Sequence, residues 1–185
     1  MSSILAESAK FRADAKKLLE ETDVLRLLAK HGRVELTGSY VLDLMMSPDI
    51  DVKVVRASMT RRRALELFNA IAKQGRFQSY MFNDNVKRRD ARFPRGYYIG
   101  LKRPYSDERW KIDVWCVEER GRDERVMKSV LSNLNDRNRL AILRLKKWAR
   151  GHRPGLPSVE IYEAVIRRHV TSLRDFKRFL NSIVD

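Results

Sequence analysis

The segment from Asp49 to Val55 constrains the fold more than any other part of this sequence. It reads Asp-Ile-Asp-Val-Lys-Val-Val, so polar residues alternate with β-branched ones. Alternate side chains of a β-strand point to opposite faces of the sheet, and β-branched residues favour strands. The pattern therefore predicts a strand that buries its aliphatic residues on one face and presents Asp49 and Asp51 together on the other.

Helical and strand patterns surround this segment in an order typical of a sheet with flanking helices. Apolar residues spaced three to four apart predict helices, and short runs of aromatic and β-branched residues between turn signals predict strands. The expected helices span residues 4–30 (one helix or a pair), 40–46, 60–74, 136–150, 158–169 and 172–183. The expected strands span residues 33–37, 49–55, 77–82, 97–102 and 110–117. We therefore expect an α+β fold, a mixed β-sheet flanked by helices with a C-terminal helical cap.

The length of the chain is typical of one compact unit. With 185 residues, 43% of them hydrophobic, it is long enough to bury one sizeable core and short for two. We expect residues 1–120 to form the sheet together with the N-terminal helix. Residues 121–185 are expected to form a helical segment that packs on it.

Basic residues outnumber acidic residues by a wide margin. The chain has 39 Lys and Arg against 24 Asp and Glu, a net charge of +15, which indicates a polyanionic partner such as RNA. The N-terminus lacks the pattern of a secretory signal, and the single cysteine, Cys116, forms no internal disulfide. No run approaches the roughly 18 uncharged apolar residues of a membrane helix. We therefore expect a cytoplasmic protein without a membrane segment, of unassigned oligomeric state.

A glycine–serine turn and two carboxylates lie close together in the sequence. Gly38 and Ser39 are followed, after nine residues, by Asp49 and Asp51. Gly38 lets the backbone approach a ligand closely, and Ser39 offers a hydroxyl and N–H groups at the start of the next helix, which suits a triphosphate. Two carboxylates on one strand face repel each other unless a hard cation such as Mg²⁺ lies between them. A third carboxylate, Asp113, stands in a later strand pattern, and three carboxylates can hold two metal ions.

This order of motifs resembles the DNA polymerase β-like nucleotidyltransferases. Their pattern is a hydrophobic residue before Gly-Ser, nine to a dozen residues, Asp-hydrophobic-Asp-hydrophobic, and a later hydrophobic-Asp-hydrophobic. Thr37 departs from it, because it stands where the family has a hydrophobic residue before Gly38. The resemblance implies a nucleotidyltransferase palm in which Gly38 and Ser39 bind the triphosphate of an NTP substrate, and in which Asp49, Asp51 and Asp113 are the catalytic residues that hold two Mg²⁺ or Mn²⁺ ions.

The C-terminal part continues the resemblance. The segment from Leu145 to Arg150 and the following Leu156-Pro157-Ser158 are similar to the region after the palm in archaeal-type CCA-adding enzymes, oligoadenylate synthases and bacterial cyclic-oligonucleotide synthases. The resemblance implies that Lys146 or Lys147 reaches the triphosphate, and we assign this role to Lys147. The chain ends before the full second lobe of those larger enzymes, so we expect no such lobe.

Basic and aromatic residues are interleaved just before the strand expected at residues 97–102. The arginines are Arg88, Arg89, Arg92 and Arg95, and the aromatic residues are Phe93, Tyr97 and Tyr98. Single-stranded nucleic acid is bound by charge and base stacking together, so we predict that the four arginines contact a nucleic acid. A solvated surface loop is the alternative that the sequence leaves open.

Two functions are compatible with these features. The first is an enzyme that transfers NMP from an NTP, with ATP among the candidates, to a hydroxyl acceptor and releases pyrophosphate. RNA or another nucleotide is the favoured acceptor because of the positive charge. The second is a basic module of the same fold that has lost its metal site and binds RNA or a protein partner. The base, the acceptor and the linear or cyclic nature of the product stay open.

Overall fold

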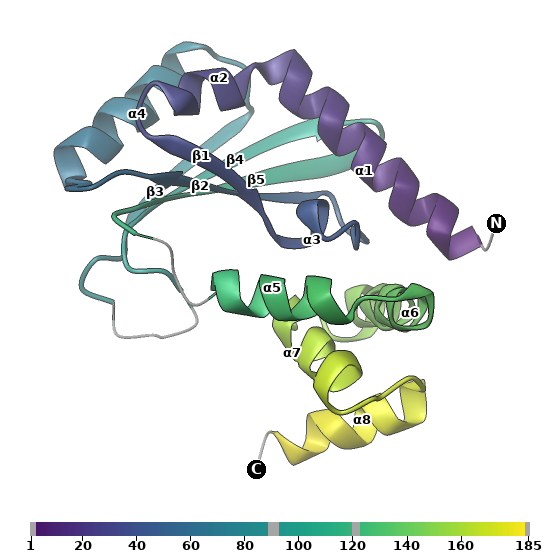
Figure 1. Cartoon of the computed structure of the whole chain (residues 1–185). Helices are drawn as coiled ribbons and strands as arrows, with labels where there is room; N and C mark the ends of the chain where they lie inside the picture. The colour runs from purple at the N-terminus through teal and green to yellow at the C-terminus, as the bar shows by residue number, and fades with distance from the viewer. Residues whose placement is uncertain (1–2, 89–92, 120–122, 184–185) are drawn as a thin grey trace.

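The computed structural model describes residues 3–88, 93–119 and 123–183. Figure 1 shows a β-sheet between two groups of helices, with α1, α2 and α4 on one side and α5 to α8 on the other. The helices are α1 (Ser3–Thr22), α2 (Val24–Ala29), α3 (Gly38–Val41), α4 (Arg61–Lys73), α5 (Asp123–Asn133), α6 (Asp136–His152), α7 (Ser158–Tyr162), the π-helix η1 (Glu163–Arg167) and α8 (Leu173–Ser182). The strands are β1 (Arg33–Thr37), β2 (Asp49–Val55), β3 (Ser79–Asp84), β4 (Tyr97–Tyr105) and β5 (Glu108–Val117).

The five strands form one mixed sheet in the order β1-β2-β5-β4-β3. Strands β2 and β5 run parallel, and the other neighbouring pairs are antiparallel. The strand predicted from the alternating pattern is β2, and it buries Ile50, Val52 and Val54 as expected. A mixed sheet with helices on its flanks confirms the expected α+β class. None of the described helices is long and apolar enough to cross a membrane.

Two clusters of buried apolar side chains hold the molecule together. The first joins the aliphatic face of the sheet to α1, α2 and α4, with Leu18, Leu28 and Ile71 among its fully buried members. The second joins α5 to α8 to the segment after α3 and includes Leu44, which is also fully buried. The carboxylate face of β2 therefore points away from the first cluster. The division at residue 120 stays a prediction.

Residues 4–30, predicted as one helix or a pair of helices, form the pair α1 and α2, which meet at Asp23 with its left-handed φ of 51°. Two other local boundaries differ from the predictions. The helix expected at residues 40–46 begins earlier, at Gly38, and ends at Val41. The turn between β4 and β5 is also tighter than predicted, because Ser106 and Asp107 both adopt positive φ values of 48° and 65°. Asp43, two residues after the end of α3, also has a left-handed φ of 54°, so left-handed backbone lies at or next to each of these boundaries.

Candidate active site

Asp49, Asp51 and Asp113 lie on two neighbouring strands of the sheet. Strands β2 and β5 pair in parallel, with Asp51 opposite Asp113 and Asp49 opposite Lys111. Residues two apart on a strand share a face, and residues opposite each other on paired strands do so too. The structure therefore brings together the three carboxylates that the sequence singled out.

Gly38 places the end of β1 directly against Asp51. Strand β1 pairs with β2 so that Thr37 lies opposite Asp51. Gly38 has a φ of 67°, a left-handed conformation that glycine adopts without a steric penalty. A Cβ atom built at Gly38 would collide with Oδ2 of Asp51. Both the backbone conformation and the available space thus require glycine, and the Gly-Ser turn borders the carboxylates.

The turn presents fewer groups to a phosphate than the sequence implies. Helix α3 has only four residues, so few peptide dipoles add up at its start. The Gly38 N–H donates to Sδ of Met127 in α5 at 3.3 Å, and Ser39 is only 8% exposed. Triphosphate binding by Gly38 and Ser39 stays a prediction.

Burial and mutual repulsion disfavour the ionised forms of the acidic pair. Burial, together with the charges of Asp49 and Asp113, raises the pKa of Asp51 to about 7. Burial and the charge of Asp113 raise the pKa of Asp49 to about 6. Oδ1 of Asp49 is buried without a hydrogen-bond partner among the described residues. This concentration of negative charge favours a cation.

Lys111 supplies part of the positive charge that the carboxylates require. Its Nζ lies 2.6 Å from Oδ2 of Asp113 and 3.8 Å from Oδ1 of Asp49. Burial acts against the charged lysine, but the charges of Asp49 and Asp113 outweigh it and raise the pKa of Lys111. One ammonium group therefore bridges two of the three carboxylates. Lys111 was not predicted, although it stands two residues before Asp113 on the same strand face.

Helix α6 directs Lys146, and not Lys147, toward the site. Lys146 is 8% exposed and donates from Nζ to the carbonyl oxygen of Leu44 at 2.8 Å. Burial lowers the pKa of Lys146 to about 8, against the opposing influence of Asp51 and Asp49. Lys147 instead pairs through Nζ with Oε2 of Glu7 in α1, at 2.5 Å.

The donor set fits a divalent cation in its chemistry. All three side chains offer carboxylate oxygens, which Mg²⁺ prefers, and Oδ1 of Asp49 accepts no hydrogen bond from the described residues. Within residues 3–88, 93–119 and 123–183, however, no group of three or more His, Cys, Asp or Glu side chains is arranged to hold a metal ion. Lys111 bridges the carboxylates instead. The residues therefore fit a cation that replaces the Lys111 ammonium group.

The basic loop is described only at its two ends. The Arg88 guanidinium lies 4.1 Å from the centre of the Phe93 ring, and Arg95 is exposed. Arg89 and Arg92 lie outside the described residues. Nucleic-acid binding by the four arginines stays a prediction.

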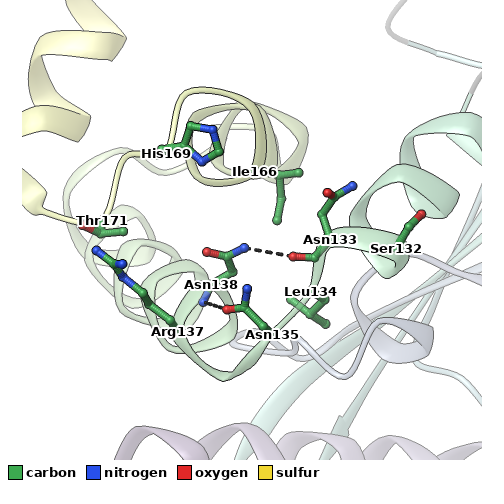
Figure 2. Close-up of a pocket in the computed structure, with 9 residues that line it drawn as sticks. All are labelled: Ser132, Asn133, Leu134, Asn135, Arg137, Asn138, Ile166, His169 and Thr171. Atoms are coloured by element: carbon green, nitrogen blue, oxygen red, sulfur yellow. Dashed lines mark hydrogen bonds between the residues drawn. The ribbon is translucent and has the colours of Figure 1, made fainter.

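A polar hollow lies in the helical part, and its lining contains none of the three carboxylates. It has a volume of about 590 Å³ and lies where α5 meets α6 and where η1 leads to α8 (Figure 2). Its lining includes Asn133, Asn135, Asn138 and His169. Asn135 caps α6 by accepting from the Asn138 N–H at 2.9 Å. The sequence predicted no residue of this hollow as functional.

Comparisons with known proteins identify the fold. No family model matches the chain, and no curated protein matches it. Among solved structures, the polymerase core of TRAMP, an RNA surveillance complex, matches with a TM-score of 0.57 and 19% identity over 82% of this chain. The non-canonical poly(A) polymerase complex of GLD-2 and GLD-3 matches with a TM-score of 0.50 and 13% identity over 90% of this chain. The chain has a nucleotidyltransferase fold.

The nucleotidyltransferase fold confirms the fold that the resemblance implied. The finer likeness to CCA-adding enzymes, oligoadenylate synthases and cyclic-oligonucleotide synthases stays a prediction. The chain matches 47% of the TRAMP polymerase core chain and 58% of the GLD-2–GLD-3 chain. It therefore spans about half the length of these structural neighbours.

Proposed function

We propose that the chain is a metal-dependent nucleotidyltransferase that transfers NMP from an NTP to a hydroxyl acceptor and releases pyrophosphate. The observation that carries the proposal is the meeting of Asp51, Asp113 and Gly38 at one place on a nucleotidyltransferase fold. The structural neighbours include a poly(A) polymerase and the polymerase core of an RNA surveillance complex. RNA is therefore the acceptor, and ATP the first nucleotide, that we propose for this chain.

Each side chain of the site has a distinct role in this proposal. Asp49 and Asp51 would hold divalent cations at the triphosphate end of the substrate, and Asp113 would serve the acceptor side. Bound Mg²⁺ or Mn²⁺ would lower the pKa of the acceptor hydroxyl and neutralise the leaving pyrophosphate. Lys146 faces the same carboxylates and takes the phosphate-binding role that the sequence assigned to Lys147. The chain's own contribution is to position these charges.

A specific contact favours a second candidate, a non-catalytic RNA-binding module. The Lys111 ammonium group already bridges Asp49 and Asp113, so it neutralises the cluster without a metal. In such a module the carboxylates and Lys111 form a structural ion network, and the net charge of +15 serves RNA binding alone. The two candidates differ in whether the carboxylates exchange this lysine for a cation.

Transfer of labelled nucleotide tests the first candidate. The protein is incubated with each α-labelled NTP, Mg²⁺ or Mn²⁺, and either no acceptor or a short single-stranded RNA. We expect label to pass from ATP to the RNA. The Asp113→Asn variant should lose transfer by more than about 100-fold, because removal of residues that merely support metal ligands already costs 10- to 100-fold.

Asp107→Asn is the matched control for this variant. Asp107 is an exposed residue in the turn between β4 and β5, so its loss should leave transfer unchanged. RNA binding without transfer from any of the four NTPs, with either ion, would instead establish the non-catalytic module.

A further inference from the structure

A row of aromatic rings leads from the basic loop to the third carboxylate. Trp115 follows Asp113 by two residues in β5 and therefore shares its face of the sheet. The Trp115 ring centre lies 5.1 Å from that of Tyr98 and 6.2 Å from that of Phe93. The Arg88 guanidinium covers Phe93 at 4.1 Å. These four side chains, here called the aromatic ladder, connect a cationic group to the site.

Tyr98 joins the inner end of the aromatic ladder to Asp113. Its hydroxyl donates to Oδ1 of Asp113 at 2.6 Å. Gly100 lies opposite Asp113 on β4, and a Cβ there would lie 2.6 Å from the Tyr98 hydroxyl oxygen. Glycine thus makes room for this hydrogen bond. Since Tyr98 is only 8% exposed, it acts as a positioning residue and not as a contact surface.

Two side chains of the aromatic ladder, Phe93 and Trp115, are accessible to solvent, unlike the side chains of an apolar core. Phe93 is 39% exposed, and Trp115 is partly exposed. Met81 lies opposite Gly100 on β3, on the same sheet face, and is 41% exposed. Flat apolar side chains next to an arginine match a ligand that has flat faces and negative charge. Nucleobases on a phosphate backbone have both properties.

We propose that Trp115 and Phe93 stack the bases of a single-stranded RNA acceptor and thereby guide its terminal hydroxyl toward Asp113. The inference rests on the proposed transfer reaction and names the acceptor-binding surface of that same site. Base stacking is tolerant of sequence because every base has an aromatic face, so the surface selects single-stranded RNA as a class. Arg88 sits at the outer end, where it neutralises a phosphate of the strand.

Binding of an ordinary and an abasic RNA tests the proposal. An eight-nucleotide oligo(A) and an abasic strand of the same length carry equal charge, and affinity is measured without NTP or metal. Wild-type protein should bind oligo(A) about ten- to a hundredfold more tightly, as loss of one stacked base predicts. Trp115→Leu and Phe93→Leu should each reduce this preference by about tenfold and leave the salt dependence unchanged.

The controls separate stacking from other effects. Phe179→Leu makes the same chemical change in α8, which is on the far side of the helical segment in Figure 1, and should bind both RNAs like the wild type. Equal affinity of the wild type for the two RNAs would overturn the proposal, and that arm needs no variant to fold. No RNA binding would also overturn it and would point to a protein or small-molecule acceptor. If the wild type prefers oligo(A) over the abasic RNA but transfers no nucleotide, only the proposed reaction is contradicted.

Discussion

At the scale of single residues, Asp51 shows the clearest conflict between stability and function. Its carboxylate is held beside Asp49 and Asp113 in a partly buried position, and its pKa is raised to about 7. Burial of a charge without a full complement of partners destabilises a fold. A fold keeps such a group where a site requires it, and perturbed pKa values concentrate at functional sites.

The pH dependence of stability should reveal this conflict. A raised pKa means that the folded protein binds more protons than the unfolded chain. The stabilisation of the fold by protonated Asp51 is therefore fully present below about pH 4 and is lost as the pH rises through about 7. Asp51→Asn cannot ionise. In metal-free buffer it should unfold several degrees above the wild type at pH 8 and at a similar temperature at pH 4. The unfolding temperatures of the wild type, Asp51→Asn and the control Asp107→Asn are measured from pH 4 to pH 8. If the unfolding temperature of Asp51→Asn followed the same pH dependence as that of the wild type and the control, the interpretation would be refuted.

At the scale of elements, helix α6 explains why Lys146, and not the predicted Lys147, lies near the carboxylates. Ile142 and Ala149 are buried, and they stand four residues before and three residues after Lys146. That spacing places Lys146 on the buried stripe of the helix and Lys147 beside it on the exposed surface. The spacing that places Lys146 on the buried face was therefore visible in the sequence. A buried lysine is rare without a charged partner, however, and the sequence showed no such partner nearby. The partners, Asp49 and Asp51, come from a distant strand.

Variants of the two lysines should separate their roles. Lys146→Met keeps the volume of the side chain and removes the charge, so metal-dependent ATP binding should weaken about tenfold, as loss of one charge-assisted hydrogen bond predicts. Lys147→Met should bind ATP like the wild type, because Lys147 pairs with Glu7. Titration calorimetry with ATP and Mg²⁺ compares them. Weakened binding in Lys147→Met alone would restore the original assignment.

The basic loop permits a second prediction at this scale. Arg88 and Arg95, replaced by Ser one at a time, should each lower the slope of log affinity against log salt by about one if they contact RNA phosphates. Arg178→Ser in α8 serves as the control and should leave the slope unchanged. RNA binding titrated at several salt concentrations gives these slopes. Unchanged slopes in both loop variants would assign the loop to the solvated surface.

Only part of the candidate site was predictable from the sequence. The alternating pattern of β2 located Asp49 and Asp51, because a strand face is a local property. Tyr98 and Lys111 were missed as partners of Asp113, although Tyr98 was noted within the basic loop. Their contacts depend on the pairing of β4 with β5 and on the space left by Gly100, which are properties of the assembled sheet.

At the scale of the whole molecule, the site forms only where the two parts of the chain meet. The sheet contributes the carboxylates, whereas α6 contributes Lys146 and α5 contributes Met127 against the Gly-Ser turn. The second apolar cluster, which includes Leu44 as well as the C-terminal helices, holds these parts together. The α+β class was predictable from local patterns, but this junction depends on contacts between residues about a hundred positions apart.

The central claim is that the carboxylates bind a nucleotide through a divalent cation, and ligand-induced thermal stabilisation tests it most directly. ATP with Mg²⁺ should raise the unfolding temperature of the wild type, whereas ATP with a chelator should not. Asp49→Ala should fold and show no shift with ATP and Mg²⁺, while Asp107→Asn should show the full shift. Equal stabilisation by ATP with and without the cation, or stabilisation by RNA together with no shift from ATP and Mg²⁺, would contradict the account.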